Sequence, residues 1–413
     1  MGGCGMLSFE QARQVILKKS APVGIEQVTL LEAVGRVLPH DLVTPWDMPR
    51  WDNSAMDGYA VRSADCRQVP CTLKVSGYIP AGASGEGVKV EPGCAVRIMT
   101  GAPSPAGCDA IVSVEETDDG QLDVTLLQPV IKGQHVRLRG EDVASGSFFI
   151  RGGTIVRPPE VNILASFGKV LVDVYRRPVV AILSTGDELV ELGGVPGPGE
   201  IINSNALSLA AAVAEMGCIP RIVGIARDTR ESHLEKLQEG LNADVLITSA
   251  GVSAGDRDLV RDVLSELGVE QIFWKVGIKP GGPTAFAMFK TTPVFSLPGN
   301  PVSTMITFEE FVRPALLKML GHQRVLRPTF KAVLREDIGK KPGKVQIVRV
   351  NLEFDEGNWF ASSAGNQATA ILKTMVDAQA LAVLPAEGVF FAKGDEIDVH
   401  FYGNYCDRVE ALQ

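Results

Sequence analysis

The segment from residue 178 to residue 326 alternates strand-like and helix-like patterns, and this alternation restricts the fold of the chain more than any other feature. The β-branched runs VVAILS, RIVGIA, DVLITS and PVFSLP have strand length, and helical patterns such as NALSLAAAVAEMG and SHLEKLQEGLN stand between them. Repeated strand–helix units are typical of parallel βαβ structure in a doubly wound sheet. We therefore predict a central, mostly parallel α/β domain over residues 178–326, with Gly217 ending its first helix.

The chain on either side of this domain has other patterns. Residues 45–145 contain short β-type runs between Gly/Pro turns, among them CTLKV, AVRIM, AIVSV and LDVTLL, which predict an inserted β-rich domain. Residues 1–44 with 146–177 are predicted to form an N-terminal helical and linker domain, whose first helix is capped by Ser8 and Gln11. Residues 327–413 return to short strands and predict a small, barrel-like β domain. A chain of 413 residues is long enough for such a multidomain architecture.

The composition excludes several classes of protein. The formal net charge of −9 argues against a nucleic-acid binder, although local lysines and backbone amides can still bind a small anion. No apolar run is long enough to span a bilayer, and the N-terminus lacks the pattern of a signal peptide. The seven cysteines include no CxxC pair, which indicates reduced thiols in the cytoplasm. The five histidines include no HxH or HExxH pair, so zinc chemistry and a Ser-His-Asp triad are poor candidates.

Two strands of the central domain end in loops of small residues and carboxylates, STGDEL and SAGVSAGDRD. Ligands of open α/β sheets bind beyond the carboxyl ends of the strands, where small residues let backbone amides approach an anion and carboxylates can hold Mg²⁺. Capping of the following helix is the competing explanation for the acids, and the missing Walker lysine disfavours a P-loop ATPase. The candidate residues are Ser184, Thr185, Gly186, Asp187 and Glu188 in the first loop, and Ser249, Gly251, Ser253, Gly255, Asp256 and Asp258 in the second.

Two further segments of this domain can contact an anion. WKVGIKPGGP carries Lys275 and Lys279, which can neutralise phosphate or a molybdate-like oxyanion, although surface lysines often have no specific role. In SLPGNPVS two prolines bracket a stiff loop ahead of a helix headed by Ser303, and a purely structural turn is the alternative. The candidate residues of this loop are Pro298, Gly299, Asn300 and Pro301.

Four polar residues of the β-rich insert and one more of the central domain complete the candidates. Asp57 and Thr100 stand in glycine-containing turns, whereas Arg137 and Asp142 belong to RLRGEDV, whose charges can equally form a self-neutralising network. Asp228 follows a strand of the central domain, where it can simply cap the helix that begins near Ser232.

Taken together, these motifs resemble the molybdopterin molybdenumtransferase family, the MoeA proteins and the gephyrin E domain. The resemblance covers essentially the whole chain and implies an elongated homodimer of four domains per subunit, with an active cleft between the central domain of one subunit and the β insert of the other. It rests on DNSAMDGYA, RIMTGAP, RGEDV, STGDEL, SAGVSAGDRD, WKVGIKPGGP and LPGNPVS, which stand in the family's order.

The implied activity is that of a cytoplasmic transferase. It takes adenylylated molybdopterin and molybdate, hydrolyses the adenylyl group in a Mg²⁺-dependent step, and releases molybdenum cofactor and AMP. Cleavage of such an anhydride needs a neutralising metal and an oriented attacking oxygen, which agrees with the carboxylates and lysines above. Possible partners are the upstream adenylyltransferase and a second subunit; neither nucleic acid nor a membrane is expected.

The resemblance also implies roles for individual residues. Its functional acids fall on Asp57, Asp142, Glu188, Asp228 and Asp258, with Thr100 beside them. Its anion- and pterin-binding positions fall on Lys275, Lys279, Pro298 and Pro301, and Arg137 is added to the predicted oxyanion-binding set. The predicted metal ligands are Glu188, Asp258 and Asp256.

Three positions depart from the family pattern. Ala250 stands where SGGVS has its first glycine, and its methyl group disfavours a positive φ. Gly282 replaces the second lysine of KPGKP and removes one cation, and Thr369 stands where serine is common. A paralogue that uses tungstate and a non-catalytic scaffold therefore stay open as alternatives, since a fold does not determine a function.

Overall fold

The computed structural model describes residues 6–251 and 259–403. The chain divides into two compact units, each with its own hydrophobic cores. The first unit contains the residues up to Pro39, Ile155–Arg157 and the chain from Leu171 onward; the second contains His40–Thr154 and Pro158–Val170. The finer division into four domains stays a prediction.

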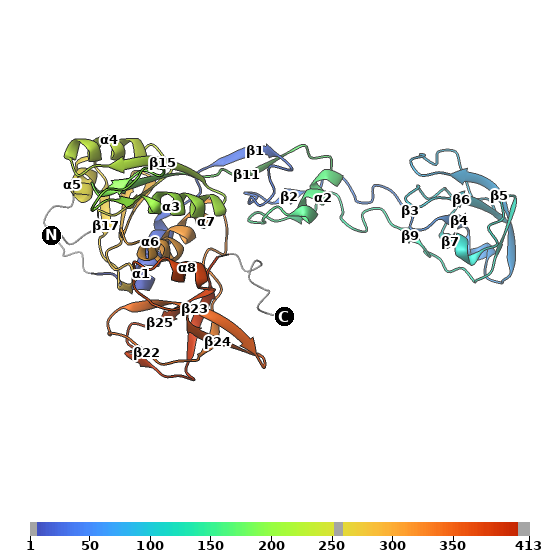
Figure 1. Ribbon diagram of the computed structural model, residues 1–413. Coiled ribbons are helices and arrows are strands. Elements are labelled where there is room, and N and C mark those ends of the chain that lie inside the picture. Colours follow the sequence, from blue (N-terminus) through green and yellow to red (C-terminus); the bar gives the residue numbers. More distant parts are fainter. Residues whose placement is uncertain (1–5, 252–258, 404–413) are drawn as a thin grey trace. The chain divides into compact units, whose positions relative to one another are not determined.

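The centre of the first unit is a six-stranded sheet in the order β15-β12-β16-β20-β19-β17. Figure 1 labels the two strands at its ends, β15 and β17. The first four strands in this order pair in parallel, and β19 and β17 extend the sheet by antiparallel pairing. This confirms the predicted doubly wound, mostly parallel domain. The strands are β12 (Val179–Thr185), β15 (Ile219–Ala226), β16 (Val245–Ser249), β17 (Glu270–Phe273), β19 (Ala285–Phe289) and β20 (Thr292–Leu297).

Helices cover both faces of this sheet because successive side chains of a strand point to opposite faces. Val180 and Ile182 of β12 belong to a core with α1, α3, α6 and α7, whereas Ala181 and Leu183 belong to a core with α4 and α5. The helices are α1 (Phe9–Lys19), α3 (Ser204–Glu215), α4 (Arg230–Gly240), α5 (Leu259–Glu266), α6 (Pro301–Thr307) and α7 (Arg313–Met319).

The helix ends follow local sequence signals, with three corrections. Ser8 and Gln11 form the predicted capping box of α1, and Gly217 follows α3 with a φ of +83°. Thr229, not Asp228, caps α4, and α6 begins at Pro301 rather than at Ser303. The pattern TMITFEEFVRPALLKMLG is not one α-helix, because a π-helical turn, η3 (Phe308–Val312), separates α6 from α7.

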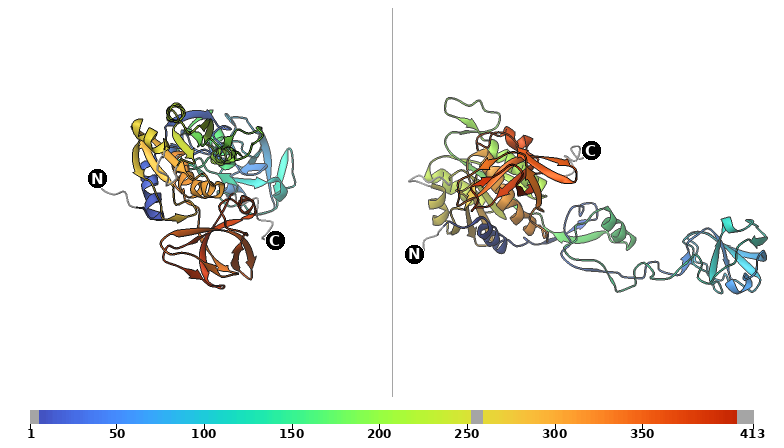
Figure 2. Two further views of the ribbon diagram at one scale, coloured as in Figure 1. Left: turned by 60° about the vertical axis from the view of Figure 1, so that its left-hand side comes forward. Right: turned by 90° about the horizontal axis from the view of Figure 1, so that it is seen from below.

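The C-terminal strands close into a small barrel, as predicted, because β23 pairs with both β24 and β25 (Figure 2). A short strand of the α/β segment, β18 (Ile278–Lys279), joins the barrel by parallel pairing with β23. The barrel segments are β21 (Phe330–Leu334), β22 (Ile338–Gly339), β23 (Val345–Asp355), β24 (Asn358–Ser363), α8 (Lys373–Asp377), β25 (Ala380–Leu384), β26 (Phe390–Phe391) and β27 (Glu396–Phe401).

Three small sheets complete the first unit, and one of them pairs β22 with β26 in antiparallel fashion. Antiparallel pairing joins β1 (Ile25–Thr29) to β11 (Leu171–Tyr175). Parallel pairing joins β13 (Leu189–Val190) to β14 (Ile201–Ile202) and places the segment after Glu188 beside the segment before α3.

The second unit is β-rich, as predicted, and is built on a five-stranded sheet in the order β7-β4-β6-β5-β8. Two-stranded pairs β3–β9 and β2–β10 accompany this sheet. The elements are β2 (Leu42–Val43), β3 (Asn53–Ser54), β4 (Gly58–Val61), η1 (Ser63–Asp65), β5 (Cys71–Ile79), β6 (Cys94–Ile98), β7 (Ala110–Ser113), η2 (Val114–Glu116), β8 (Asp123–Leu126), β9 (Val136–Arg137), β10 (Phe148–Ile150) and α2 (Pro158–Ser166).

Among the described residues, no helix has the length and apolar character needed to cross a membrane.

Candidate functional site

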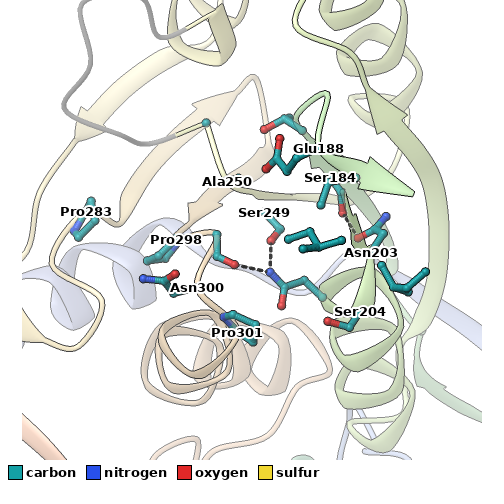
Figure 3. A pocket seen from close by; sticks show the side chains of 17 residues that line it. Ser184, Glu188, Asn203, Ser204, Ser249, Ala250, Pro283, Pro298, Asn300 and Pro301 are labelled. Atoms are coloured by element: carbon teal, nitrogen blue, oxygen red, sulfur yellow. Dashed lines mark hydrogen bonds between the residues drawn. The ribbon is translucent and has the colours of Figure 1, made fainter. Parts of the chain in front are cut away.

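A cavity of about 490 Å³ lies in the first unit, at the carboxyl ends of β12, β16 and β20 (Figure 3). This is the edge at which doubly wound sheets bind ligands, and the volume is typical of a small-molecule site. Residues from four predicted loops line it together. These are Ser184, Thr185, Glu188, Ser249, Gly251, Pro283, Pro298, Gly299, Asn300 and Pro301.

Glu188 brings an unpaired carboxylate to this cavity. Gly186 precedes it with a φ of +134°, and a Cβ at this glycine would collide with the Glu188 carboxylate, so the close approach requires glycine. The Glu188 side chain is exposed and has no hydrogen bond or ion pair within the described residues. Its oxygens are therefore available to a cation or to a donor group of a ligand.

Two asparagines at the start of α3 organise the cavity wall. Ser184 Oγ donates to Asn203 Oδ1 at 2.8 Å, and Asn205 Nδ2 donates both to Ser249 Oγ at 2.9 Å and to the Gly299 carbonyl at 2.8 Å. Asn205 thus connects the end of β16 to the loop after β20. Asn203 Nδ2 and Asn205 Oδ1 are buried without a partner in the described part of the chain. Because such groups are costly when unsatisfied, they favour a polar ligand in the cavity.

Sequence analysis did not predict these asparagines, nor the other lining residues Leu189, Ile201, Ile202 and Ser204. A signal was present, since IINSNA stands directly before a helical pattern and contains three residues that favour N-cap positions. Asn203 is indeed the N-cap residue of α3. The loop GGVPGPGE separates this segment from Glu188 in the sequence, and only the β13–β14 pairing brings the two together.

We expect Asn205→Ala to lower the free energy of unfolding by about 1–3 kcal/mol, because it removes two hydrogen bonds, one of them to the buried Ser249 hydroxyl and one to the exposed Gly299 carbonyl. Denaturant unfolding measures the change. Asn242→Ala is the matched control, since Asn242 makes one exposed bond to the Gln238 carbonyl. Equal losses in both variants would contradict the bridging role of Asn205.

Ala250 has a φ of +74°, although its methyl group disfavours this region, and Gly251 has the same φ. The expectation that Ala250 would resist a positive φ is therefore wrong for the backbone. The Ala250 N–H donates to the Leu297 carbonyl at 3.0 Å, and its methyl group faces Gly299, where an added Cβ would lie 3.1 Å away. The candidates Ser253, Gly255, Asp256 and Asp258 lie outside the described residues.

Lys275 and Lys279 do not line the cavity. Both are exposed and lie on the segment that ends in Pro283, which does line it. In the sheet register, Lys279 of β18 lies opposite Gln346 of β23, so the lysine segment runs along the barrel. The two predicted cations are therefore not in the wall of the cavity, although their segment leads to Pro283.

Arg349 of β23 is a buried cation that sequence analysis missed. It is 1% exposed, its Nη2 donates to the Asn366 carbonyl at 3.1 Å, and its Nε and Nη1 have no hydrogen-bond partner in the described part of the chain. Burial lowers the pKa of its guanidinium. The turn that it contacts continues to Thr369, whose hydroxyl accepts a bond from Asn300 Nδ2 at 3.2 Å. Arg349 thus supports a turn that contacts the cavity wall.

Asp187 and Asp228 meet beside the cavity without lining it. The Asp228 N–H donates to Asp187 Oδ1 at 3.1 Å, and both side chains are exposed. Arg227 Nη1 donates to the carbonyls of Asp187 and Leu189 at 3.1 and 3.0 Å and so holds this loop. Asp228 is therefore neither the cap of α4 nor a cavity residue.

Asp57, Thr100 and Arg137 of the second unit lie around β3, whereas Asp142 donates its N–H to the Met48 carbonyl at 3.0 Å. Asn53 of β3 pairs with Arg137, and the Gly101 N–H donates to the Ser54 carbonyl at 2.8 Å. Asp57 Oδ1 accepts bonds from both the N–H and the hydroxyl of Thr100 at 2.7 Å. Both bonds lower the pKa of Asp57, and the bond from the Thr100 N–H contributes most. In RLRGEDV, Arg139 pairs with Asp47, so the expected network within this motif does not form.

The fold defines a multidomain protein whose α/β domain has a cavity with a polar wall at the carboxyl edge of its sheet. Residues 181–318 match the family model described as a probable molybdopterin binding domain. Residues 7–168 match the MoeA N-terminal region (domain I and II), and residues 331–402 match the MoeA C-terminal region (domain IV).

Curated relatives and solved structures extend the match to nearly the whole chain. The chain is 37% identical over 406 residues to molybdopterin molybdenumtransferase 2 of Mycobacterium tuberculosis H37Rv, covering 95% of this chain and 99% of the relative. It is 37% identical over 382 residues to the molybdopterin molybdenumtransferase of a Nostoc species, covering 90% of this chain and 87% of the relative. The MoeA crystal structure from Pyrococcus horikoshii OT3 matches with a TM-score of 0.80 and 30% identity, and the match covers 96% of this chain and 100% of the Pyrococcus chain. The chain belongs to the molybdopterin molybdenumtransferase (MoeA) family.

Proposed function

We propose that the protein inserts molybdenum into molybdopterin, with adenylylated molybdopterin and molybdate as substrates and with molybdenum cofactor and AMP as products. The observation that carries this proposal is the unpaired Glu188 carboxylate in a cavity of about 490 Å³, surrounded by small-residue loops and buried polar atoms without partners. The names of the relatives support the reaction class.

The donor set agrees with Mg²⁺ as the metal of this reaction. Mg²⁺ is commonly bound by one or two carboxylates together with substrate phosphates, and Glu188 offers such a carboxylate. Asp258 and Asp256 are further proposed ligands, outside the described residues. When bound, Mg²⁺ would neutralise charge on the phosphoryl oxygens.

The remaining residues bind and orient the substrates. Ser184, Thr185 and the loop Pro298–Pro301 would contact the pterin and phosphate groups, and Asn205 keeps this wall in place. Lys275 and Lys279 would attract the oxyanion, since both are exposed and lie on the segment that leads to Pro283. We assign Asp57, Thr100, Arg137 and Asp142 of the second unit, and Asp187 and Asp228 of the first, to the same reaction. We also propose a homodimer in the cytoplasm that can receive its substrate from the upstream adenylyltransferase.

An assay of the purified protein with adenylylated molybdopterin and Mg²⁺ tests this function. We expect AMP release that depends on added molybdate. Release with tungstate alone would point to a paralogue that uses the other oxyanion. If neither oxyanion promotes AMP release, the proposed reaction is wrong and the scaffold alternative gains support.

A further inference from the structure

The segment Lys279–Pro283 approaches the barrel closely at Gly282. Val345 donates its N–H to the Gly277 carbonyl at 2.9 Å, and the β18–β23 pairing continues from there. Lys344 directly precedes Val345, so these backbone bonds hold the Lys344 backbone beside this segment. A Cβ added to Gly282 would lie 3.3 Å from the Ile278 carbonyl oxygen and 3.4 Å from Lys344 Nζ.

The Lys344 ammonium thus lies where a side chain at position 282 would begin. Gly282 directly precedes Pro283, which lines the cavity, so the segment that the Lys344 ammonium approaches leads into the cavity wall. Lys344 is exposed and has no ion pair or hydrogen bond among residues 6–251 and 259–403. A charge without an internal partner is available to an anion.

The surroundings of Lys344 favour an anion over a structural ion pair. Lys279 stands on the same segment and is also exposed, and Arg349 lies further along β23. Two carbonyl oxygens, of Val276 and Ile278, border the same point at 3.7 and 3.3 Å from the added Cβ and can orient the ammonium. Lys279 lies opposite Gln346, two residues after Lys344, so two exposed lysines stand on paired segments in a protein of net charge −9.

We propose that Lys344 is an oxyanion-binding residue that supplies, from the barrel, the positive charge that the KPGGP segment lacks at Gly282. The anion is molybdate or the phosphate of the substrate, and this inference rests on the proposed function. The absence of a side chain at Gly282 then has a reason, because it leaves space for the Lys344 ammonium.

Lys344→Ala tests the inference, with two readouts. Calorimetric titration with molybdate alone should show affinity reduced about tenfold, the size of one charge-assisted hydrogen bond. In the AMP-release assay the KM for molybdate should rise by a similar factor while kcat changes less than twofold. Lys341→Ala is the matched control, since Lys341 is an exposed lysine three residues away.

Charge restoration separates binding from a structural role. Lys344→Ala combined with Gly282→Lys should recover most of the molybdate affinity, because Gly282 does not have a positive φ and an added Cβ needs only a small shift from the Ile278 carbonyl oxygen, 3.3 Å away. If Lys344→Ala matches Lys341→Ala, or if the unaltered protein does not bind molybdate, the inference is wrong. If molybdate binds as expected but no AMP is released, the proposed function fails and the assignment of Lys344 as an oxyanion ligand stands.

Discussion

Glu188→Gln is expected to lower kcat for AMP release about 100- to 1000-fold, the size of one lost electrostatic contact to a developing charge. The substitution keeps the shape of the side chain but removes the negative charge that Glu188 presents to the cavity. Because the Glu188 carboxylate has no partner in the described part of the chain, its loss should leave the fold intact. Turnover at saturating substrates, together with the thermal unfolding temperature, measures both effects.

Glu191→Gln is the matched control for this prediction. Glu191 is exposed, stands three residues further on and does not line the cavity. Glu191→Gln should keep kcat within about twofold of the wild-type value. Asp258 lies outside the described residues, and Asp258→Ala should lower kcat as much as Glu188→Gln does. Normal turnover in both Glu188→Gln and Asp258→Ala would refute the site assignment.

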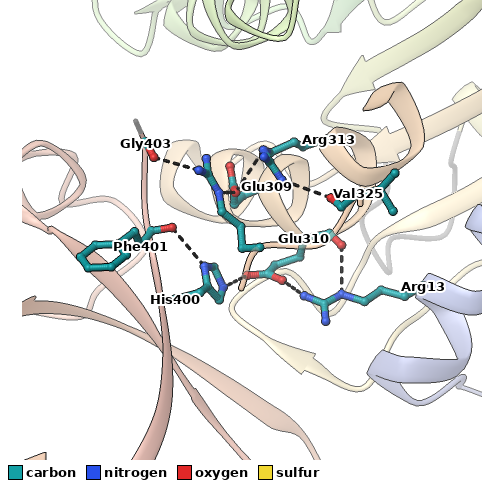
Figure 4. Close-up of polar contacts among 9 residues, drawn as sticks. Arg13, Glu309, Glu310, Arg313, Val325, His400, Phe401 and Gly403 are labelled. Carbon is teal, nitrogen blue, oxygen red and sulfur yellow. Dashed lines mark hydrogen bonds and ion pairs between the residues drawn. The ribbon is translucent and has the colours of Figure 1, made fainter. Parts of the chain in front are cut away.

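Glu310→Leu is expected to lower the free energy of unfolding by about 3 kcal/mol, because it breaks a buried ion pair with Arg13. This value is the lower end of the range for buried pairs, since 23% of the Arg13 side chain is exposed to water. Glu310 is 1% exposed and belongs to η3 (Figure 4). Its Oε1 accepts from His400 Nε2 at 2.9 Å and its Oε2 pairs with Arg13. Leucine would leave the charge of Arg13 and the ring of His400 without this acceptor.

The π-helical turn explains why this cluster joins three segments. Pro314 has no N–H to donate to the Glu310 carbonyl four residues earlier, and Arg13 Nε donates to that carbonyl instead at 3.2 Å. One glutamate thereby connects α1, the helices of the α/β domain and β27 of the barrel. Glu353→Leu is the control, because the Arg335–Glu353 pair is exposed and should contribute less than about 1 kcal/mol. A similar loss in both variants would contradict the buried-pair explanation.

The effect of Glu310→Leu should also depend on pH. Burial lowers the pKa of His400, but the hydrogen bond and charge of Glu310 outweigh it, so the net pKa lies above 6.5. Burial raises the pKa of Glu310, but His400 and Arg13 outweigh it, so the net pKa lies below 4.5.

The raised pKa of His400 contributes stability that is complete below about pH 6.5 and is lost as pH rises through the folded-state pKa. The lowered pKa of Glu310 contributes stability that is present above about pH 4.5 and is lost on acidification. The difference in unfolding free energy between wild type and Glu310→Leu should therefore be larger at pH 6 than at pH 9. Denaturant titrations at both pH values measure it, and a difference independent of pH would argue against a charged His400.

The elements of the fold were predictable because their signals are local. Strand-length β-branched runs, the Ser8 capping box and Gly217 each act within a few residues, and all three are in place. The general rule for open sheets then located the cavity at the ends of β12 and β16, with Ser184, Glu188 and Ser249 in its wall. The helix break at η3 was missed because the apolar period continues through Phe311 and Val312, and only the missing N–H of Pro314 indicates it.

The sequence by itself determined which strands and helices form and which edge of the sheet carries the site, because periodicity and capping act between near neighbours along the chain. Only the tertiary structure decided that Asn205 connects two loops, that Arg349 supports the turn at Thr369, and that Lys344 stands over Gly282. Each of these contacts joins residues more than forty positions apart or on different segments. No local pattern specifies such pairs, since they arise from the packing of complete elements against one another.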